Sequence, residues 1–356
     1  MVILQKKPLM IYTKVYSENT MGNRRKFIKQ SLFASSVVML PLPLSALKKL
    51  DIMTKETKFD VLIIGGSYTG LSAAMALGRS LRNVLIIDAG NPCNEQTPHS
   101  HNFITQDGAT PASISAKAKE QVLEYPTVQF LKDFAVQGKK IENGFEITTQ
   151  SCQSFQGRKL IFATGIKDIL PKIDGFAECW GITAVHCPYC HGYEVRKVKT
   201  GILANGEAAF ETAKLISNWT EELSIYTNGK SELNKDQLKE LSKNNILVIE
   251  KPIASIEHTD GHIEKLKFKD GTMETLKALY ARVPFKQHSA IPETLGCELD
   301  ENGYIEVDMF QKTSVPGVFA CGDNTTFIRS VAQAVYAGNV AASSLNKELI
   351  ERDWIA

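Results

Sequence analysis

Short apolar runs alternate with helical patterns along most of the chain. Residues 59–64 form an almost wholly apolar run, as expected of a buried parallel strand. A glycine-rich turn, residues 65–70, follows at once, and a helical pattern then extends from Leu71 to Leu81. A second apolar run, residues 83–87, ends in Asp88. This order predicts a strand, a tight turn, a helix and a second strand.

The glycine-rich turn has the chemistry of a dinucleotide site. In such a turn, backbone N–H groups and the positive end of the helix dipole face a pyrophosphate. Gly65, Gly66 and Gly70 belong to the turn, and Ser67 stands where a second fingerprint glycine is usual. Asp88, eighteen residues after Gly70, can accept a hydrogen bond from a ribose hydroxyl. We predict dinucleotide binding, with a plain structural turn as the alternative; the motif alone does not separate NAD from FAD.

A second unit of the same kind follows later in the chain. Residues 199–204 form a short strand-like run, residues 205–211 lead into a helix, and residues 223–226 are again apolar. This layout predicts a second Rossmann-like unit.

A pair of cysteines lies between the two units. Two residues separate Cys187 from Cys190, a spacing that lets the pair close into a disulfide on the first turn of a helix. There the helix dipole and a nearby imidazolium lower the thiol pKa from about 8.5 toward neutrality. The pair can then cycle between dithiol and disulfide. The alternatives are half a zinc site that also uses His186 and His191, and two inert buried thiols; we expect no metal, because no second CxxC or HxxxH occurs.

The histidine after the pair is a candidate proton carrier. His191 has an ordinary pKa near 6.5, which suits it to take and return thiol protons at neutral pH. A helix cap or a solvent-facing ring is the alternative. Glu194 could orient this imidazole, but a solvated carboxylate fits the spacing equally well.

The C-terminal part of the chain carries a turn and a short apolar strand that ends in Gly322 and Asp323. A helix predicted at about 330–345 follows. Its small residues, which allow a ligand to approach closely, are Ala332, Ala334, Ala337 and Gly338.

The formal net charge of +2 combines two unlike parts of the chain. The first fifty residues hold nine Lys or Arg and one acid, which leaves 32 basic and 38 acidic residues elsewhere. The main body is therefore acidic, which argues against a broad nucleic-acid-binding surface.

The basic charge belongs to a leader. Arg24 and Arg25 lie in a basic cluster that precedes an uncharged run, residues 31–47, shorter than the roughly 20 residues that span a bilayer. Residues 21–46 resemble a twin-arginine export signal. A basic tail without targeting information and a permanent membrane helix are the alternatives.

From about residue 57 to 350, the order of these motifs resembles the low-molecular-weight thioredoxin reductases, which are FAD-dependent pyridine nucleotide-disulfide oxidoreductases. The resemblance implies that Asp323, after Gly322, binds the ribityl chain of FAD, and that Thr164 and Gly165 mark the crossing between two domains. It also implies that the first turn of the C-terminal helix faces the flavin; the residues concerned are Gln333 and Ala334.

The resemblance further implies roles for the two sulfurs. Cys190 would face the flavin, and Cys187 would exchange with the substrate sulfur. The nine residues around the pair are similar to those of a subgroup of small-molecule dithiol oxidases. In that subgroup three histidines lie near the flavin pocket, and the matching positions are His99, His101 and His186.

NADPH is possible but doubtful. Gly206, Ala209 and Glu211 match the family's NADPH unit, whereas Ala204 replaces its first glycine. The arginine cluster that holds the 2′-phosphate in the family is replaced by residues 227–230, with a single lysine that cannot form a bidentate clamp. No acid for NADH stands there either.

We therefore predict an α/β fold with two Rossmann-like three-layer dinucleotide-binding domains, the second inserted into the first. The predicted parts are a leader (1–56), an FAD-binding domain (57–172 and 288–356) and an inserted NAD(P)-binding-like domain with the CxxC pair (173–287). The predicted function is an FAD-dependent thiol–disulfide oxidoreductase acting on a small dithiol or disulfide, or on a thioredoxin-like protein. An oxygen-dependent dithiol oxidase without NADPH use and a non-catalytic flavin-binding redox module are the alternatives. We also expect a homodimer, no nucleic-acid partner, membrane contact only through the leader, and export to the periplasm, with a cytoplasmic location as the alternative.

Overall fold

The computed structural model describes residues 58–355, so the predicted export signal lies outside the described residues. The strands are β1 (Lys58–Ile64), β2 (Val84–Asp88), β3 (Val128–Lys132), β4 (Ala135–Ile141), β5 (Gly144–Thr149), β6 (Ser154–Phe162), β7 (Ile166–Asp168), β8 (Ala184–Val185), β9 (Thr200–Leu203), β10 (Leu223–Tyr226), β11 (Leu247–Ile249), β12 (Ile253–Thr259), β13 (His262–Phe268), β14 (Met273–Thr275), β15 (Ala278–Ala281), β16 (Phe285–Gln287) and β17 (Val318–Ala320). The helices are α1 (Tyr68–Arg79), α2 (Pro111–Leu123), α3 (Phe176–Cys179), α4 (Pro188–His191), α5 (Gly206–Ile216), α6 (Lys235–Lys243), α7 (Ile291–Thr294) and α8 (Val331–Ile355). None of the helices between residues 58 and 355 has the length and apolarity that crossing a bilayer requires.

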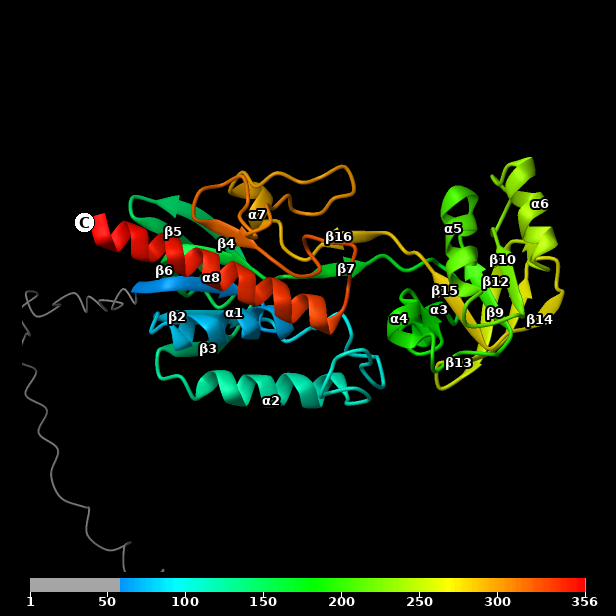
Figure 1. Cartoon of the computed structure of the whole chain (residues 1–356), viewed down its shortest axis with the longest axis horizontal. Coiled ribbons are helices and arrows are strands. Elements are labelled where there is room, and N and C mark those ends of the chain that lie inside the picture. The colour runs from blue at the N-terminus through cyan, green and yellow to red at the C-terminus, as the bar shows by residue number, and fades with distance from the viewer. Residues whose placement is uncertain (1–57, 356) are drawn as a thin grey trace, which may run out of the picture. The chain divides into compact units, whose positions relative to one another are not determined.

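The first sheet contains the strands that the sequence predicted around the glycine-rich turn. Strands β3, β2, β1, β6 and β17 run parallel, and the antiparallel strands β5 and β4 extend this sheet beyond β6. The central strand β1 is buried on both faces, as its apolar run predicts, whereas β5 alternates between buried and half-buried residues. Helices α1 and α8 pack together against one face (Figure 1).

Two predicted helices are longer than their sequence patterns indicated. Helix α1 begins at Tyr68, within the turn itself, and α8 extends to Ile355. The N-terminal half of α8 is rich in small residues, and at Gly338 an added Cβ would lie 2.2 Å from the Thr69 carbonyl oxygen. This close packing presses α8 against the start of α1, and both helices begin near the same edge of the sheet.

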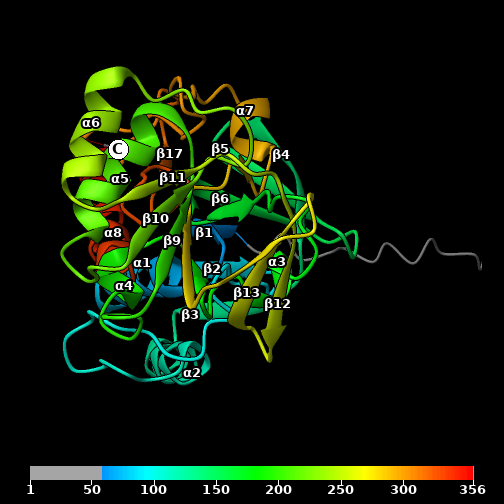
Figure 2. The same cartoon turned by 90° about the vertical axis from the view of Figure 1, so that its right-hand side faces the viewer.

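The second sheet is wholly parallel, in the order β11-β10-β9-β15-β8. Helices α5 and α6 lie on one face, and the antiparallel strands β12, β13 and β14 form a separate layer on the other (Figure 2). Apolar side chains fill both interfaces; Phe210 and Ile202 belong to the helical side, and Leu266 and Leu279 to the other.

A two-stranded ribbon of β7 and β16 lies where the chain leaves the first sheet and returns to it. The predicted fold class is therefore confirmed: two three-layer α/β units, the second inserted into the first.

Candidate active site

The carboxyl ends of β1, β2 and β6 open into one cavity of about 370 Å³. This size lies within the usual range for small-molecule sites, and the position is the one at which open parallel sheets bind ligands. Eight predicted cofactor residues line the cavity: Gly65, Gly66, Ser67, Asp88, Thr164, Gly165, Asp323 and Ala334.

Two positions of the turn after β1, Gly65 and Gly70, have room only for glycine. Gly65 has a φ of +102°, and a Cβ there would lie 2.2 Å from the Ala163 carbonyl oxygen. A Cβ at Gly70 would lie 1.9 Å from the Gly65 carbonyl oxygen, so α1 begins in direct contact with the turn. The Gly66 N–H donates to the Asp88 carboxylate at 2.8 Å, which fixes the acid at the mouth of the turn.

The start of α1 suits a phosphate. Its N-cap residue, Ser67, makes no capping hydrogen bond with its side chain, and the first turn of the helix contains no acid. The first N–H groups of a helix are unpaired unless a cap or ligand accepts from them. The residues of this turn therefore fit the pyrophosphate of FAD.

Three predicted cofactor residues lie behind the cavity wall. Gly70 packs on Gly65, and Gly322, with a φ of +92°, packs on Thr69, whose hydroxyl oxygen would lie 2.5 Å from an added Cβ. The N–H of Gln333 donates to the Ser330 hydroxyl at 3.1 Å, so the Ser330 side chain caps the start of α8.

The turn after β9 differs from the first in its partners. The Asn205 side-chain oxygen accepts from the N–H of Gly206 and from the N–H of Glu232, both at 2.9 Å. The Asn205 amide also donates to the Lys230 carbonyl oxygen at 2.9 Å, so the loop after β10 is tied across the turn. A Cβ at Gly206 would lie 3.4 Å from the Glu232 carboxylate, and Glu207 adds an acid to the first turn of α5.

The second turn thus offers a capped helix and two carboxylates where the phosphates of NADPH would need free N–H groups and positive charge. In the loop, Thr227 donates its hydroxyl to the Gly229 carbonyl oxygen, and Asn228 accepts from the N–H of Ile253. These residues do not fit the 2′-phosphate of NADPH.

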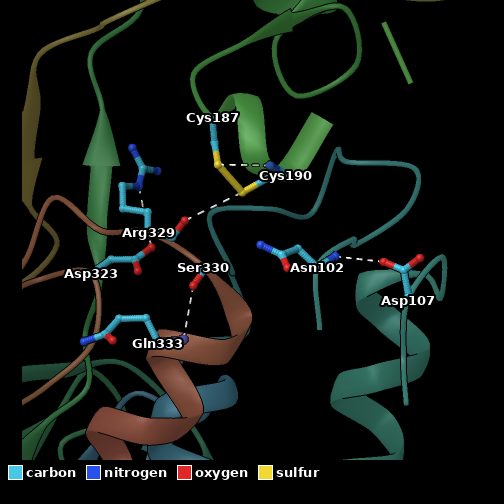
Figure 3. The surroundings of a disulfide bond; sticks show 8 residues. All are labelled: Asn102, Asp107, Cys187, Cys190, Asp323, Arg329, Ser330 and Gln333. Atoms are coloured by element: carbon cyan, nitrogen blue, oxygen red, sulfur yellow. Dashed lines mark hydrogen bonds and ion pairs between the residues drawn. A yellow bond between two sulfur atoms is a disulfide. The ribbon is translucent and has the colours of Figure 1, made fainter. Parts of the chain in front are cut away.

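The cysteines form a disulfide at the start of α4, as predicted. Cys187 is the N-cap residue, and its sulfur accepts from the Cys190 N–H at 3.2 Å. Cys190 lines the cavity, and its sulfur lies 3.9 Å from the Arg329 carbonyl oxygen (Figure 3). Within residues 58–355, no group of three or more His, Cys, Asp or Glu side chains is arranged to hold a metal ion.

Five histidines line the cavity, and His288 is the one that the sequence did not single out. The other four are His99, His101, His186 and His191. Burial lowers the pKa of His191, and the charge of Glu194 offsets part of this decrease. His191 is therefore a neutral imidazole at neutral pH and can accept a proton.

The fold also brings residues distant in sequence next to His101 and His186. Glu194 lies 3.5 Å from the His101 ring, whose other nitrogen lies 3.5 Å from Asp107. Enclosure by the cavity wall and the charge of Arg329 lower the pKa of His186, whose ring lies 5.9 Å from that of Trp180.

Sequence reasoning missed a charged group beside the disulfide. Arg329 forms a two-point ion pair with Asp168, with N–O distances of 2.9 and 3.1 Å, and lies 3.6 Å from Asp323. Burial raises the pKa of Asp323. The exposed Cys93 thiol lies 3.6 Å from Asp323, and desolvation by the surrounding cavity wall, with that carboxylate's charge, raises the pKa of Cys93. A lone arginine just before a helix of small residues was the available signal.

Comparison with known proteins agrees with this geometry. A family described as pyridine nucleotide-disulphide oxidoreductase matches residues 59–338. The thioredoxin reductase tcpT of Claviceps purpurea is 32% identical over 309 residues, which cover 84% of this chain and 96% of that protein. The thioredoxin reductase aclD of Aspergillus oryzae is also 32% identical, over 82% of this chain and 96% of its own length. The solved oxidoreductase from Agrobacterium tumefaciens is 35% identical with a TM-score of 0.77, over 82% of this chain and 99% of that one.

Proposed function

We propose that this chain, which belongs to the pyridine nucleotide-disulphide oxidoreductase family, moves electrons between FAD and a dithiol or disulfide substrate by way of Cys187 and Cys190. It is a thioredoxin-reductase-like, FAD-dependent thiol–disulfide oxidoreductase. One observation carries the assignment of the two sulfurs: Cys190 lines the cavity that also contains the uncapped turn of α1.

FAD supplies a carrier that takes up or releases two electrons. At the substrate side, a thiolate of a dithiol substrate attacks the Cys187 sulfur, which breaks the disulfide and forms a mixed disulfide. The second substrate thiol then closes the substrate disulfide and releases the Cys187 and Cys190 sulfurs as a dithiol. His191, half-buried and neutral, holds and returns the proton of a thiol in this exchange.

The return step regenerates the protein disulfide. Two S–H bonds break as the S–S bond forms, and FAD held in the cavity that Cys190 lines would accept the two electrons and two protons. Asp88 and the first turn would hold the adenosine and pyrophosphate parts of FAD, and Asp323 would hold its ribityl chain. The remaining cofactor contacts come from residues 164–165 and from the start of α8.

An anaerobic titration tests the proposal. We expect a yellow protein whose visible flavin absorbance disappears on addition of dithiothreitol and is unaffected by NADPH or NADH. A colourless protein that cannot take up FAD would contradict the proposal, as would one zinc ion per chain bound to the two sulfurs.

A second candidate function is an oxygen-dependent oxidase of small dithiols. The capped and acidic turn of α5 supports it, because it removes the usual route for electrons from NADPH. In this case one dithiol and one O₂ give one disulfide and one hydrogen peroxide. Peroxide release with a dithiol and no nicotinamide is the expected result; a strict need for a separate redox protein would exclude this function.

We propose that the chain forms a homodimer, that the domain boundaries lie at 172/173 and 287/288, and that the basic leader directs export. Light scattering tests the first, limited proteolysis the second, and cell fractionation with N-terminal sequencing of the mature protein the third.

A further inference from the structure

Arg329 and Asp168 form a buried ion pair that the proposed thiol chemistry does not use. Arg329 lies in the segment before α8, and Asp168 ends β7, the outgoing strand of the connecting ribbon. Their side chains are 13% and 9% exposed, and the guanidinium binds both carboxylate oxygens. A two-point contact of this kind fixes direction as well as distance, because both groups are planar.

The cysteine-bearing part of the chain contacts Asp168 and Arg329 once each. The Trp180 indole N–H, just after α3, donates to the Asp168 carboxylate at 3.3 Å. The Cys190 sulfur, in α4, lies 3.9 Å from the carbonyl oxygen of Arg329 (Figure 3). The indole therefore contacts the ion pair itself, and the disulfide contacts the backbone of Arg329.

Trp180 is itself held in place by neighbouring rings. It stacks on Phe176 with ring centres 5.6 Å apart, and its ring centre lies 5.9 Å from that of His186, the residue before Cys187. Since Trp180 is 5% exposed, its N–H has little freedom to find another acceptor. A path of contacts through Trp180 and His186 thus joins Asp168 to the start of the cysteine motif.

The Arg329 guanidinium also faces the wall of the cavity in which FAD would bind. The Arg329 Nε lies 3.6 Å from the carboxylate of Asp323, which lines the cavity. The Arg329 guanidinium therefore contacts Asp168 of the ribbon and Asp323 of the cavity wall. The backbone carbonyl of Arg329 faces Cys190.

We infer that Asp168, Arg329 and Trp180 form a latch that holds the Cys187–Cys190 disulfide against the FAD pocket, with Asp168 and Arg329 as positioning residues for the step between Cys190 and FAD. The inference rests on the proposed function, because only that step requires the sulfur to stay within reaction distance of the cofactor. Electron and proton transfer steps tolerate little displacement, and a misplacement of about 1 Å can cost a hundredfold in rate.

Two variants weaken the latch contacts while they keep the surrounding packing or charge. Trp180→Phe removes one N–H and keeps the stacking on Phe176, and Arg329→Lys keeps the charge but loses the two-point contact. The matched controls are Trp354→Phe and Arg352→Lys, which change exposed side chains at the end of α8.

The first measurement needs no turnover. The full chain is reduced with a dithiol, freed of excess reagent and treated with iodoacetamide, and mass spectrometry gives the ratio of alkylated Cys190 to alkylated Cys187. With the latch intact we expect Cys190 to be the more protected thiol. Both latch variants should raise the ratio about two- to tenfold, the net effect of losing a typical hydrogen bond, and neither control should change it.

The second measurement is the rate at which a dithiol removes the visible flavin absorbance. We expect a decrease of about tenfold or more in Arg329→Lys and a smaller one in Trp180→Phe, with unchanged FAD content in Trp180→Phe. Wild-type alkylation ratios in both variants would overturn the latch, and so would a change confined to Arg329→Lys. Failure of the proposed function gives a different result, because the wild-type flavin absorbance would then be unaffected by any dithiol while the alkylation ratio still reports on the latch.

Discussion

The turns after β1 and β9 share one backbone plan and differ in what their helix N–H groups contact. Each turn follows a buried parallel strand and leads into a helix, α1 or α5. In the first, the N-cap Ser67 leaves the helix start uncapped. In the second, Asn205 accepts from Gly206 and ties down the loop that contains Glu232.

The difference shows that a strand–turn–helix arrangement is not enough to bind a dinucleotide. A phosphate needs unpaired N–H groups and a local positive potential. The first turn provides both, with its one carboxylate, Asp88, held at the mouth by the Gly66 N–H. The second turn has its own internal acceptor, and the carboxylates of Glu207 and Glu232 oppose a phosphate.

The largest expected effect is the loss of FAD when one methyl group is added to the first turn; the same change in the second turn is the comparison. In Gly65→Ala the Cβ would lie 2.2 Å from a carbonyl oxygen at a φ of +102°, so the turn must move, and strain of about 1–3 kcal/mol adds to the clash. We expect nearly complete loss of FAD. In Gly206→Ala, at a φ of +57° and with a side chain as its nearest neighbour, we expect about 1–2 kcal/mol of destabilisation and full FAD content.

The measurements are the flavin-to-protein ratio of the purified variants and their thermal unfolding. Equal flavin loss in both variants would contradict the distinction between the turns.

Next in size is the removal of either sulfur, which separates thiol chemistry from flavin binding. We expect Cys187→Ser and Cys190→Ser to lower turnover with a dithiol about a thousandfold or more, because a serine cannot form the disulfide. FAD content should not change, since neither sulfur belongs to the first turn. Cys152→Ser, at an exposed free thiol, is the control and should retain full activity. Unchanged turnover in the cysteine pair variants would favour a non-catalytic flavin module.

Local patterns predicted the first turn and the cysteine motif well, because each depends on neighbours in sequence. The apolar run before Gly65 became β1, and Cys187 begins a helix as the CxxC spacing predicts. The small residues of α8 predicted a close approach, which Gly338 makes to α1.

Contacts between distant segments could not be predicted in this way. The sequence suggested that Glu194 could orient His191, whereas the fold brings Glu194 within 3.5 Å of the His101 ring. Asp168 and Arg329 have no motif, and only the return of the chain from the inserted unit brings them together. In the second turn, the missing arginines were visible in the sequence, but the cap by Asn205 depends on how the later loop folds back.

A smaller effect is expected at His191, which lines the same cavity as the first turn. Burial lowers the pKa of His191, so its proton-accepting form predominates at neutral pH and is lost as the pH falls through that lowered pKa. We expect the rate of flavin reduction by a dithiol to fall at acidic pH with a midpoint below about 6.5. His191→Asn should lower the rate about a hundredfold and remove this acidic limb.

A pH series of the reductive half-reaction measures both features of His191. His262→Asn, at an exposed position of β13, is the control. An acidic limb that persists unchanged in His191→Asn would assign that proton to another group.

The smallest expected effect is a gain rather than a loss, and it tests the comparison most directly. The double variant Asn205→Gly with Glu232→Arg removes the cap from Gly206 and places a guanidinium where a carboxylate now lies. We expect weak NADPH binding, with a Kd on the order of 1 mM, and unchanged FAD content. Glu232→Gln alone removes one charge but keeps the Asn205 cap, so it should gain no measurable binding. Calorimetry with NADPH distinguishes these cases: if the wild type already binds as tightly as the double variant, then capping and charge do not decide the difference between the two turns. If only the double variant binds, the second turn has a nucleotide-binding backbone that its own side chains keep closed.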